Sequence, residues 1–222
     1  MGRHCCRDLE MGSLMLTIAS PNTDRSLLTT AELRGAAGVG DNSRDAELIP
    51  LGRYVSAMIT KACRVSAAAG IPPTLRSEAV VETFRIGCKQ GSVVLSRRPV
   101  TEISAVSEDG EDLADGDYEI DGSGILYRLS SNVRSEWLRA EVSVSYTAGW
   151  ATVPDDLKYA AIKFVRAELT TGSRDPLLKR LKVDGISERE WWVEPTKDTV
   201  VPSDVLDILR RGGYVNLSTS FA

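Results

Sequence analysis

The stretch Trp137–Tyr146, WLRAEVSVSY, decides the fold, because apolar and polar side chains alternate along it. Every second residue from Leu138 to Tyr146 is apolar, and the residues between them are polar or charged. This period of two is typical of a β-strand that buries one face and exposes the other to water.

The same period of two extends back along the chain to Glu78. Two Asp-Gly dipeptides, at 109–110 and 121–122, stand between strand-like runs, as they do in β-hairpins. We therefore predict an antiparallel sheet over residues 77–150, with one face in water.

Helical patterns flank this sheet on its N-terminal side. Thr29–Glu32 fits a capping box, which begins a short helix that ends at Gly38 or Gly40. A second, longer helix is predicted from near Ser43 to Ala69, because apolar residues recur there at three- and four-residue steps.

Helical patterns return after the sheet. Pro154 suits the first helical position, and the two aspartates after it suit the positive end of the helix dipole. This helix is expected to end at Gly172, and Ser203–Arg211 predicts a last, short helix.

The predicted fold class is α+β: a helical bundle with an inserted small antiparallel β-sheet and an extended C-terminal arm. Residues 27–76 and 151–182 would form the bundle, 77–150 the insertion, and 183–222 the arm with its short helix. Residues 1–26, which include a short apolar patch at 14–19, are expected to be an N-terminal extension.

The composition argues against several classes of function. The chain has 222 residues, 42% of them hydrophobic, which is enough to bury a core. The formal net charge is -4, and without a basic surplus tight nucleic-acid binding is not expected. No apolar run approaches the roughly 20 residues that a membrane span needs, so no membrane partner is predicted.

The sequence contains little that could do catalysis. The only histidine is His4, which excludes a nucleophile–histidine pair in the body of the chain. The cysteines, at 5, 6, 63 and 88, lack the spacing of zinc ligands. We therefore predict no enzyme, no cofactor and no metal site.

One acidic stretch leaves an alternative open. Glu108–Asp121 holds eight carboxylates, which is the charge pattern of a solvated sheet edge. A small carboxylate-dependent hydrolase would instead need two of these acids together in a cleft. A host-encoded interaction module is a third possibility.

Two features near the C-terminus suggest contacts with other molecules. Trp191-Trp192 is either an interface anchor or a cap on a small core. The apolar residues of Ser203–Arg211 lie on a helix too short to be stable alone. That helix needs a packing partner, either in its own bundle or on a neighbouring subunit, and we expect the partner to be another subunit.

Several short segments occur in a characteristic order between residues 27 and 214. They are Thr29–Arg34, Arg98–Val106, Asp117–Asp121, Val144–Leu157 and Val201–Leu206. In their order and spacing these segments resemble the head–tail connector (adaptor) family of tailed phages and gene transfer agents.

The resemblance implies a structural protein that forms a ring, a dodecamer, docked on the portal protein. The ring would carry the next neck protein, a stopper or tail-terminator, and DNA would pass transiently through its lumen. The protein would be assembled in the bacterial cytoplasm and would reside in the virion neck. The predicted portal-binding residues lie near the C-terminus: Trp191, Trp192, Val205, Leu206, Leu209, Arg210, Arg211 and Tyr214.

Overall fold

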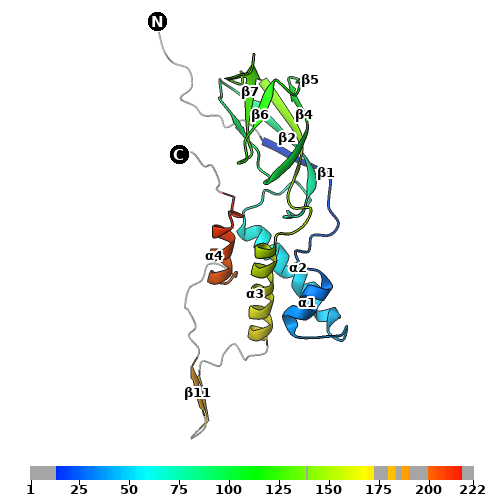
Figure 1. Cartoon of the computed structure of the whole chain (residues 1–222), viewed down its shortest axis with the longest axis vertical. Coiled ribbons are helices and arrows are strands. Elements are labelled where there is room, and N and C mark those ends of the chain that lie inside the picture. Colours follow the sequence, from blue (N-terminus) through cyan, green and yellow to red (C-terminus); the bar gives the residue numbers. More distant parts are fainter. Residues whose placement is uncertain (1–13, 139, 173–179, 184–186, 191–199, 217–222) are drawn as a thin grey trace. The chain divides into compact units, whose positions relative to one another are not determined.

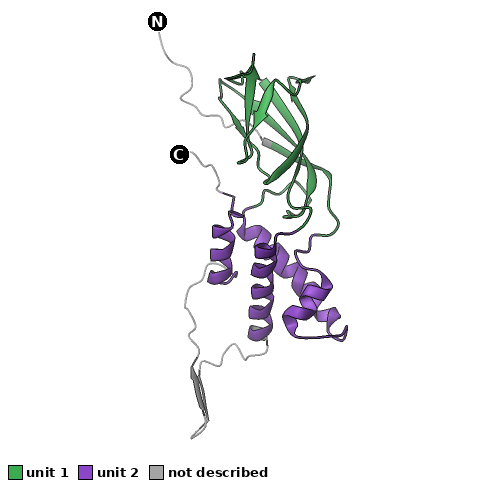
Figure 2. Cartoon of the chain, in the orientation of Figure 1, with its two compact units in different colours: residues 1–24, 65–152 green, residues 25–64, 153–222 purple. Residues whose placement is uncertain are grey.

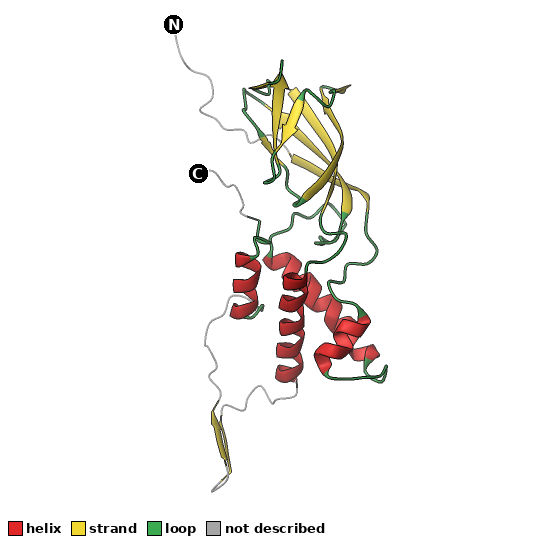
Figure 3. Ribbon diagram, in the orientation of Figure 1, coloured by secondary structure: helices red, strands yellow, loops and turns green. Residues whose placement is uncertain are grey.

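The computed structural model describes residues 14–138, 140–172, 180–183, 187–190 and 200–216. The chain divides into two compact units, which Figure 2 shows in different colours. The sheet unit comprises Met1–Asp24 and Val65–Thr152, and the helical unit comprises Arg25–Arg64 and Val153–Ala222. Figure 3 shows the strands of the first unit and the helices of the second.

The larger sheet of the sheet unit is antiparallel throughout. Among the described residues it has five strands, in the order β1 (Leu14–Ser20), β2 (Glu78–Ile86), β9 (Ala140–Ala148), β4 (Val100–Glu108) and β5 (Glu111–Asp112). The predicted alternation in the strand that ends at Tyr146 is confirmed, because Val142, Val144 and Tyr146 are buried while Glu141 is exposed.

A second antiparallel sheet contains β3 (Val93–Val94), β7 (Ile125–Ser130) and β6 (Tyr118–Ile120), with β8 (Val133–Ser135) paired to β7. One hydrophobic core joins the two sheets. Its fully buried side chains include Val80, Val142 and Val144 from the first sheet, Leu126 from the second, and Trp137.

The helical unit contains α1 (Thr30–Ala37), α2 (Asp45–Ala62), α3 (Asp155–Gly172) and α4 (Ser203–Arg211). The capping box is confirmed, because the Thr29 side chain accepts from the Glu32 N–H and the Glu32 carboxylate accepts from the Thr29 N–H. α3 contacts each of the other three helices, and Leu48, Ile59, Leu157 and Phe164 are fully buried. Within the described residues, no helix combines the length and hydrophobicity needed to cross a bilayer.

Between α3 and α4, β10 (Arg180–Val183) and β11 (Ser187–Glu190) form an antiparallel hairpin, which is labelled in Figure 1.

The predicted fold class, a helical bundle with a small inserted sheet, is wrong. Over the described residues, nine strands form two antiparallel sheets and two more form the β10–β11 hairpin, against four helices. Three causes contribute. The patch at 14–19 pairs with β2 as strand β1. Strands such as β3 and β5 are two residues long, too short to show a period of two. The helix predicted to reach Ala69 ends at Ala62, because Arg64 adopts a left-handed φ of 54°.

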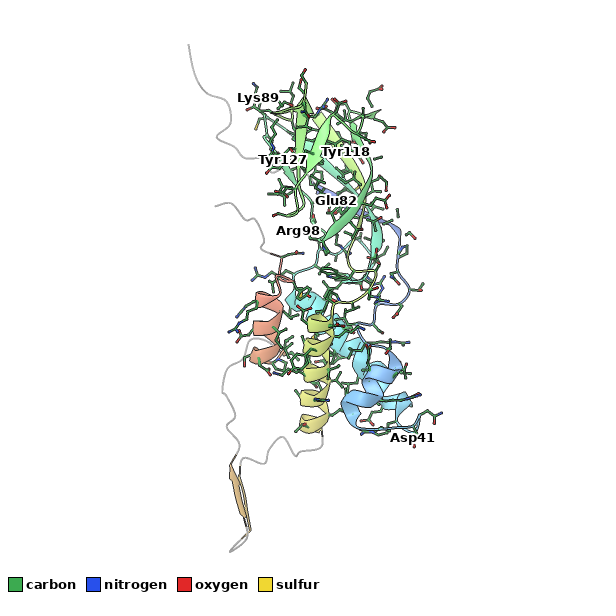
Figure 4. All side chains as sticks on the ribbon, in the orientation of Figure 1. Asp41, Glu82, Lys89, Arg98, Tyr118 and Tyr127 are labelled. Atoms are coloured by element: carbon green, nitrogen blue, oxygen red, sulfur yellow. The ribbon has the colours of Figure 1, made fainter. Side chains whose placement is uncertain are left out.

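Ionisable groups are buried on the core side of the larger sheet. Glu82 of β2 has no exposed surface, and Figure 4 shows it among the strands of the sheet unit. Both of its carboxylate oxygens accept from the Ser96 N–H at 3.1 Å. Nearby, Arg97 lies 3.5 Å from Glu78 and donates to the Thr74 carbonyl. These contacts attach the segment between β3 and β4 to β2.

Burial raises the pKa of the Glu82 carboxyl, and hydrogen bonds from Ser96 and Tyr146 only partly oppose this effect. The folded state therefore holds this proton more tightly than the unfolded state does. The tighter proton binding by Glu82 stabilises the folded state fully below the pKa that this carboxyl has in the unfolded state. This stabilisation is lost as the pH rises through its pKa in the folded state.

We expect Glu82→Gln, which removes the ionisation, to gain stability relative to the wild type as the pH rises from 4.5 to 8. Urea unfolding across this range measures the difference, and Glu102→Gln on the exposed part of β4 is the control. A difference between Glu82→Gln and wild type that stays constant with pH would contradict the expected buried titration.

Candidate assembly surface

The C-terminal helix α4 is held against the helical unit by its apolar face. Val205 and Leu209, one turn apart, have no exposed surface, and Val201 just before the helix is 5% exposed. α4 contacts α3, beside which it lies in Figure 1. Because a helix of this length is marginal alone, burial of these side chains provides most of the stabilisation. Its packing partner therefore lies in its own chain, and the expectation that this helix packs on another subunit is wrong.

Polar contacts attach both ends of the α4 segment. The Lys163 ammonium of α3 lies 2.6 Å from the Asp204 carboxylate in the first turn of α4. Their hydrogen bond raises the pKa of Lys163 and lowers the pKa of Asp204. Beyond the helix, the Tyr214 hydroxyl donates to the Asp156 carboxylate of α3. The Asn216 N–H donates to the carbonyl oxygen of Cys63 at 2.9 Å.

The structure separates the predicted portal-binding residues into three groups. Val205 and Leu209 face the interior, and Tyr214 is half-buried with its hydroxyl bonded. Leu206 is half-buried, and Arg210 and Arg211 are exposed. Trp191 and Trp192 lie outside the described residues. Among the described residues of this set, Leu206, Arg210 and Arg211 form an outward group that stays accessible while α4 is docked. Portal contact by all of the predicted residues stays a prediction.

The outward group is small and basic. Arg210 lies 3.8 Å from Asp207, one turn earlier, and both side chains are more than 60% exposed. Such an exposed pair contributes little to stability and leaves Arg210 available for another partner. With Arg211 it places two cations at the negative end of the helix dipole, beside the apolar Leu206.

Most of the acidic residues considered for a hydrolase have structural partners. Arg128 lies 3.1 Å from Glu108 and 3.8 Å from Asp117, and Arg134 lies 3.2 Å from Glu119. Asp121 accepts from the N–H groups of the turn that follows it. These contacts attach strands and turns to one another, which supports the structural interpretation of this stretch.

In the described ranges, no group of three or more histidine, cysteine or acidic residues could hold a metal ion. His4, Cys5 and Cys6 fall outside those ranges.

The sequence patterns missed the polar contacts that join α1, α2 and α3 of the helical unit. Lys158 of α3 lies 2.9 Å from Glu32 of α1, and Arg34 lies 2.5 Å from Asp45 of α2. The Arg166 guanidinium donates to the carbonyl oxygen of Ala36 at 3.3 Å. None of these pairs has a local signal, because the partners come from different helices.

A family model described as head completion protein matches residues 26–166, from before α1 to within α3. None of the curated proteins matches the chain. Among solved structures, the chain is similar to one chain of "Neck of native GTA particle computed with C12 symmetry". That similarity has 20% identity and a TM-score of 0.42, and it covers 74% of this chain and 87% of that one.

The family match covers more than half of the chain and includes α1, α2, β2 to β9 and most of α3. It confirms the resemblance to head–tail connectors that the order of sequence segments predicted. On this evidence the chain belongs to the head completion protein family.

Proposed function

We propose that this protein is a structural head–tail connector, or adaptor, in the neck of a phage or gene transfer agent particle. Copies of the chain form a dodecameric ring that docks on the portal protein and carries a stopper or tail-terminator protein. DNA passes through the lumen of the ring. The family match over residues 26–166 is the observation that carries this proposal.

The structure offers further support for a non-enzymatic role. The acidic stretch is engaged in structural contacts, and the helical unit is tied together by ion pairs between its helices. A net charge of -4 suits a passage that does not retain DNA, because grip on the phosphate backbone requires a surplus of cations. Family membership favours the adaptor over a hydrolase or a host interaction module.

Particles made without this protein test the role directly. We expect DNA-filled heads without attached tails, seen by electron microscopy, and recovery of tailed particles when the wild-type gene is supplied in trans. Normal tailed particles in the absence of the protein would refute the adaptor role.

For the portal contact, we propose the outward side of α4: Leu206, Arg210 and Arg211. The conservative pair Arg210→Gln and Arg211→Gln removes two exposed cations at the end of the helix. We expect portal binding to weaken by about tenfold or more, because these charges would meet the partner directly. Binding is measured by interferometry on immobilised portal rings at two salt concentrations.

The matched control is Arg85→Gln with Lys89→Gln in the sheet unit. Both side chains are 71% exposed, and each forms an exposed ion pair, with Glu141 and Glu136. Lys89 is labelled in Figure 4. Equal losses of affinity in both double variants would mean that net charge, and not the α4 surface, determines binding.

A further inference from the structure

The outer face of α2, a helix labelled in Figure 1, carries positive charge. Arg53, Lys61 and, just beyond the helix, Arg64 are exposed. Eight residues of α-helix place Lys61 about 12 Å along the axis from Arg53 and on the same side of the helix. Within the described part of the chain, none of these three side chains forms an ion pair or a hydrogen bond. Their charges are therefore available to a partner of opposite charge.

No acidic residue of α2 interrupts this face. Both acids of the helix lie in its first turn, and each pairs with an arginine. The exposed residues beside and between the cations, Pro50, Tyr54 and Ala57, are uncharged. A negatively charged partner that lies along the helix from Pro50 to Arg64 therefore meets no repulsion from α2 itself.

This face differs from the rest of the described surface, where most cations have acidic partners. Lys158 and Lys163 of α3, for example, lie 2.9 and 2.6 Å from acids of neighbouring helices. The helix dipole favours cations in the last turn of α2, which accounts for Lys61. It does not account for Arg53, which lies about two and a half turns before the end of the helix at Ala62. The face is thus more positively charged than the stability of the helix requires.

We propose that this face of α2 contacts the phosphate backbone of double-stranded DNA. The proposal rests on the proposed function, in which DNA passes through the ring. Arginine and lysine neutralise phosphates without reading sequence, and the Tyr54 hydroxyl is a donor of the kind that proteins direct at phosphate oxygens. An acidic surface on a protein partner is the alternative. A second copy of the chain is a poor source of such a surface, because Arg128 and Arg134 already pair with three carboxylates of its acidic stretch.

The number of cations sets the strength of this contact. Each neutralised phosphate contributes roughly −0.9 to the slope of log affinity against log salt, so three contacts give about −2.7. The affinity should therefore fall roughly 500-fold when the salt concentration rises tenfold. Such a contact is weak at physiological salt, which agrees with the net charge of -4 and with DNA that moves through the ring.

A triple variant, Arg53→Gln with Lys61→Gln and Arg64→Gln, tests the contact. Because all three positions are exposed, the substitutions should leave the urea unfolding midpoint close to that of the wild type. Fluorescence anisotropy of a labelled DNA duplex with the purified full chain, at about 15 to 150 mM salt, measures the affinity and its salt dependence. We expect the variant to bind DNA at least tenfold more weakly at the lowest salt. Its salt slope should be less steep than that of the wild type by about 2.7.

The matched control removes three cations from exposed ion pairs of the sheet unit: Arg85→Gln with Lys89→Gln and Arg134→Gln. It should keep the salt slope of the wild type. An unchanged slope in the α2 variant, or equal changes in both variants, would overturn the proposal.

A third result would also overturn it: an α2 variant that binds DNA normally but no longer assembles on portal rings, because the face would then serve a protein partner. DNA binding by the purified chain is measured without the portal. Failure of the DNA contact therefore leaves portal docking to be observed separately, and failure of the adaptor role is recognised independently.

Discussion

Gly149→Ala is expected to destabilise the sheet unit by about 2–5 kcal/mol. Gly149 follows β9 with a left-handed φ of 99°, a conformation that costs any residue with a Cβ. A Cβ at this position would also overlap the carbonyl oxygen of Arg76 and lie 2.8 Å from its carbonyl carbon. Both obstacles are backbone atoms, which cannot move aside as a flexible side chain would.

The clash matters because the chain is tightly bonded there. The Gly149 N–H donates to Pro99 and the Trp150 N–H to Leu75, both at 2.9 Å. Urea unfolding measures the loss of stability, and peptide-resolved hydrogen exchange measures the loss of protection in β2 and β9. Gly70→Ala is the matched control, since its φ is 76° and, among the described atoms, none lies within 4 Å of the added Cβ. We expect it to cost about 1 kcal/mol, and equal effects at the two glycines would contradict the clash.

Leu209→Ala is expected to release α4 from the helical unit. The Leu209 side chain has no exposed surface, and truncating such a residue costs about 2–5 kcal/mol through lost burial and the cavity left behind. Because few other apolar contacts hold so short a helix, this loss should exceed the free energy that keeps α4 docked. Hydrogen exchange should then accelerate across 203–211 while the sheet unit keeps its protection.

The neighbouring leucine provides the control for this prediction. Leu206 is half-buried on the same helix, and Leu206→Ala should cost less than about 1 kcal/mol and leave α4 protected. If Leu209→Ala left α4 as protected from exchange as in the wild type, burial of the Leu209 side chain would not be what holds the helix in place.

Local signals predicted the elements whose causes are local. The capping box at Thr29 and the left-handed Gly38 fix α1, and Asp109-Gly110, with φ values of 51° and 85°, turns the chain between β4 and β5. The last helix was also predicted with the bounds Ser203–Arg211 that the structure has. In each case a few adjacent residues carry the necessary chemistry.

Pairings between distant residues could not be predicted in this way. β1 reads as an apolar patch, because three consecutive apolar residues at its start hide the alternation, and its partner β2 lies far along the chain. The Lys163–Asp204 ion pair likewise joins two helices that no local pattern associates. The error in fold class followed from these non-local contacts, since a sheet whose outer strands go unrecognised looks like a small insertion.

The same limit applies to the candidate assembly surface. The apolar and basic residues of the last helix were identified from the sequence, but periodicity does not say which apolar face is already occupied. α3 occupies the face of Val205 and Leu209, and this leaves Leu206, Arg210 and Arg211 outward. A portal contact that α4 makes while docked therefore has to use these three outward residues.

Electron microscopy of the purified protein mixed with rings of its cognate portal is the most direct test of the adaptor role. A ring of additional density on one face of the portal, with one copy of this chain for each portal subunit, is the predicted result. Portal rings without added density, at protein concentrations of tens of micromolar or more, would contradict it.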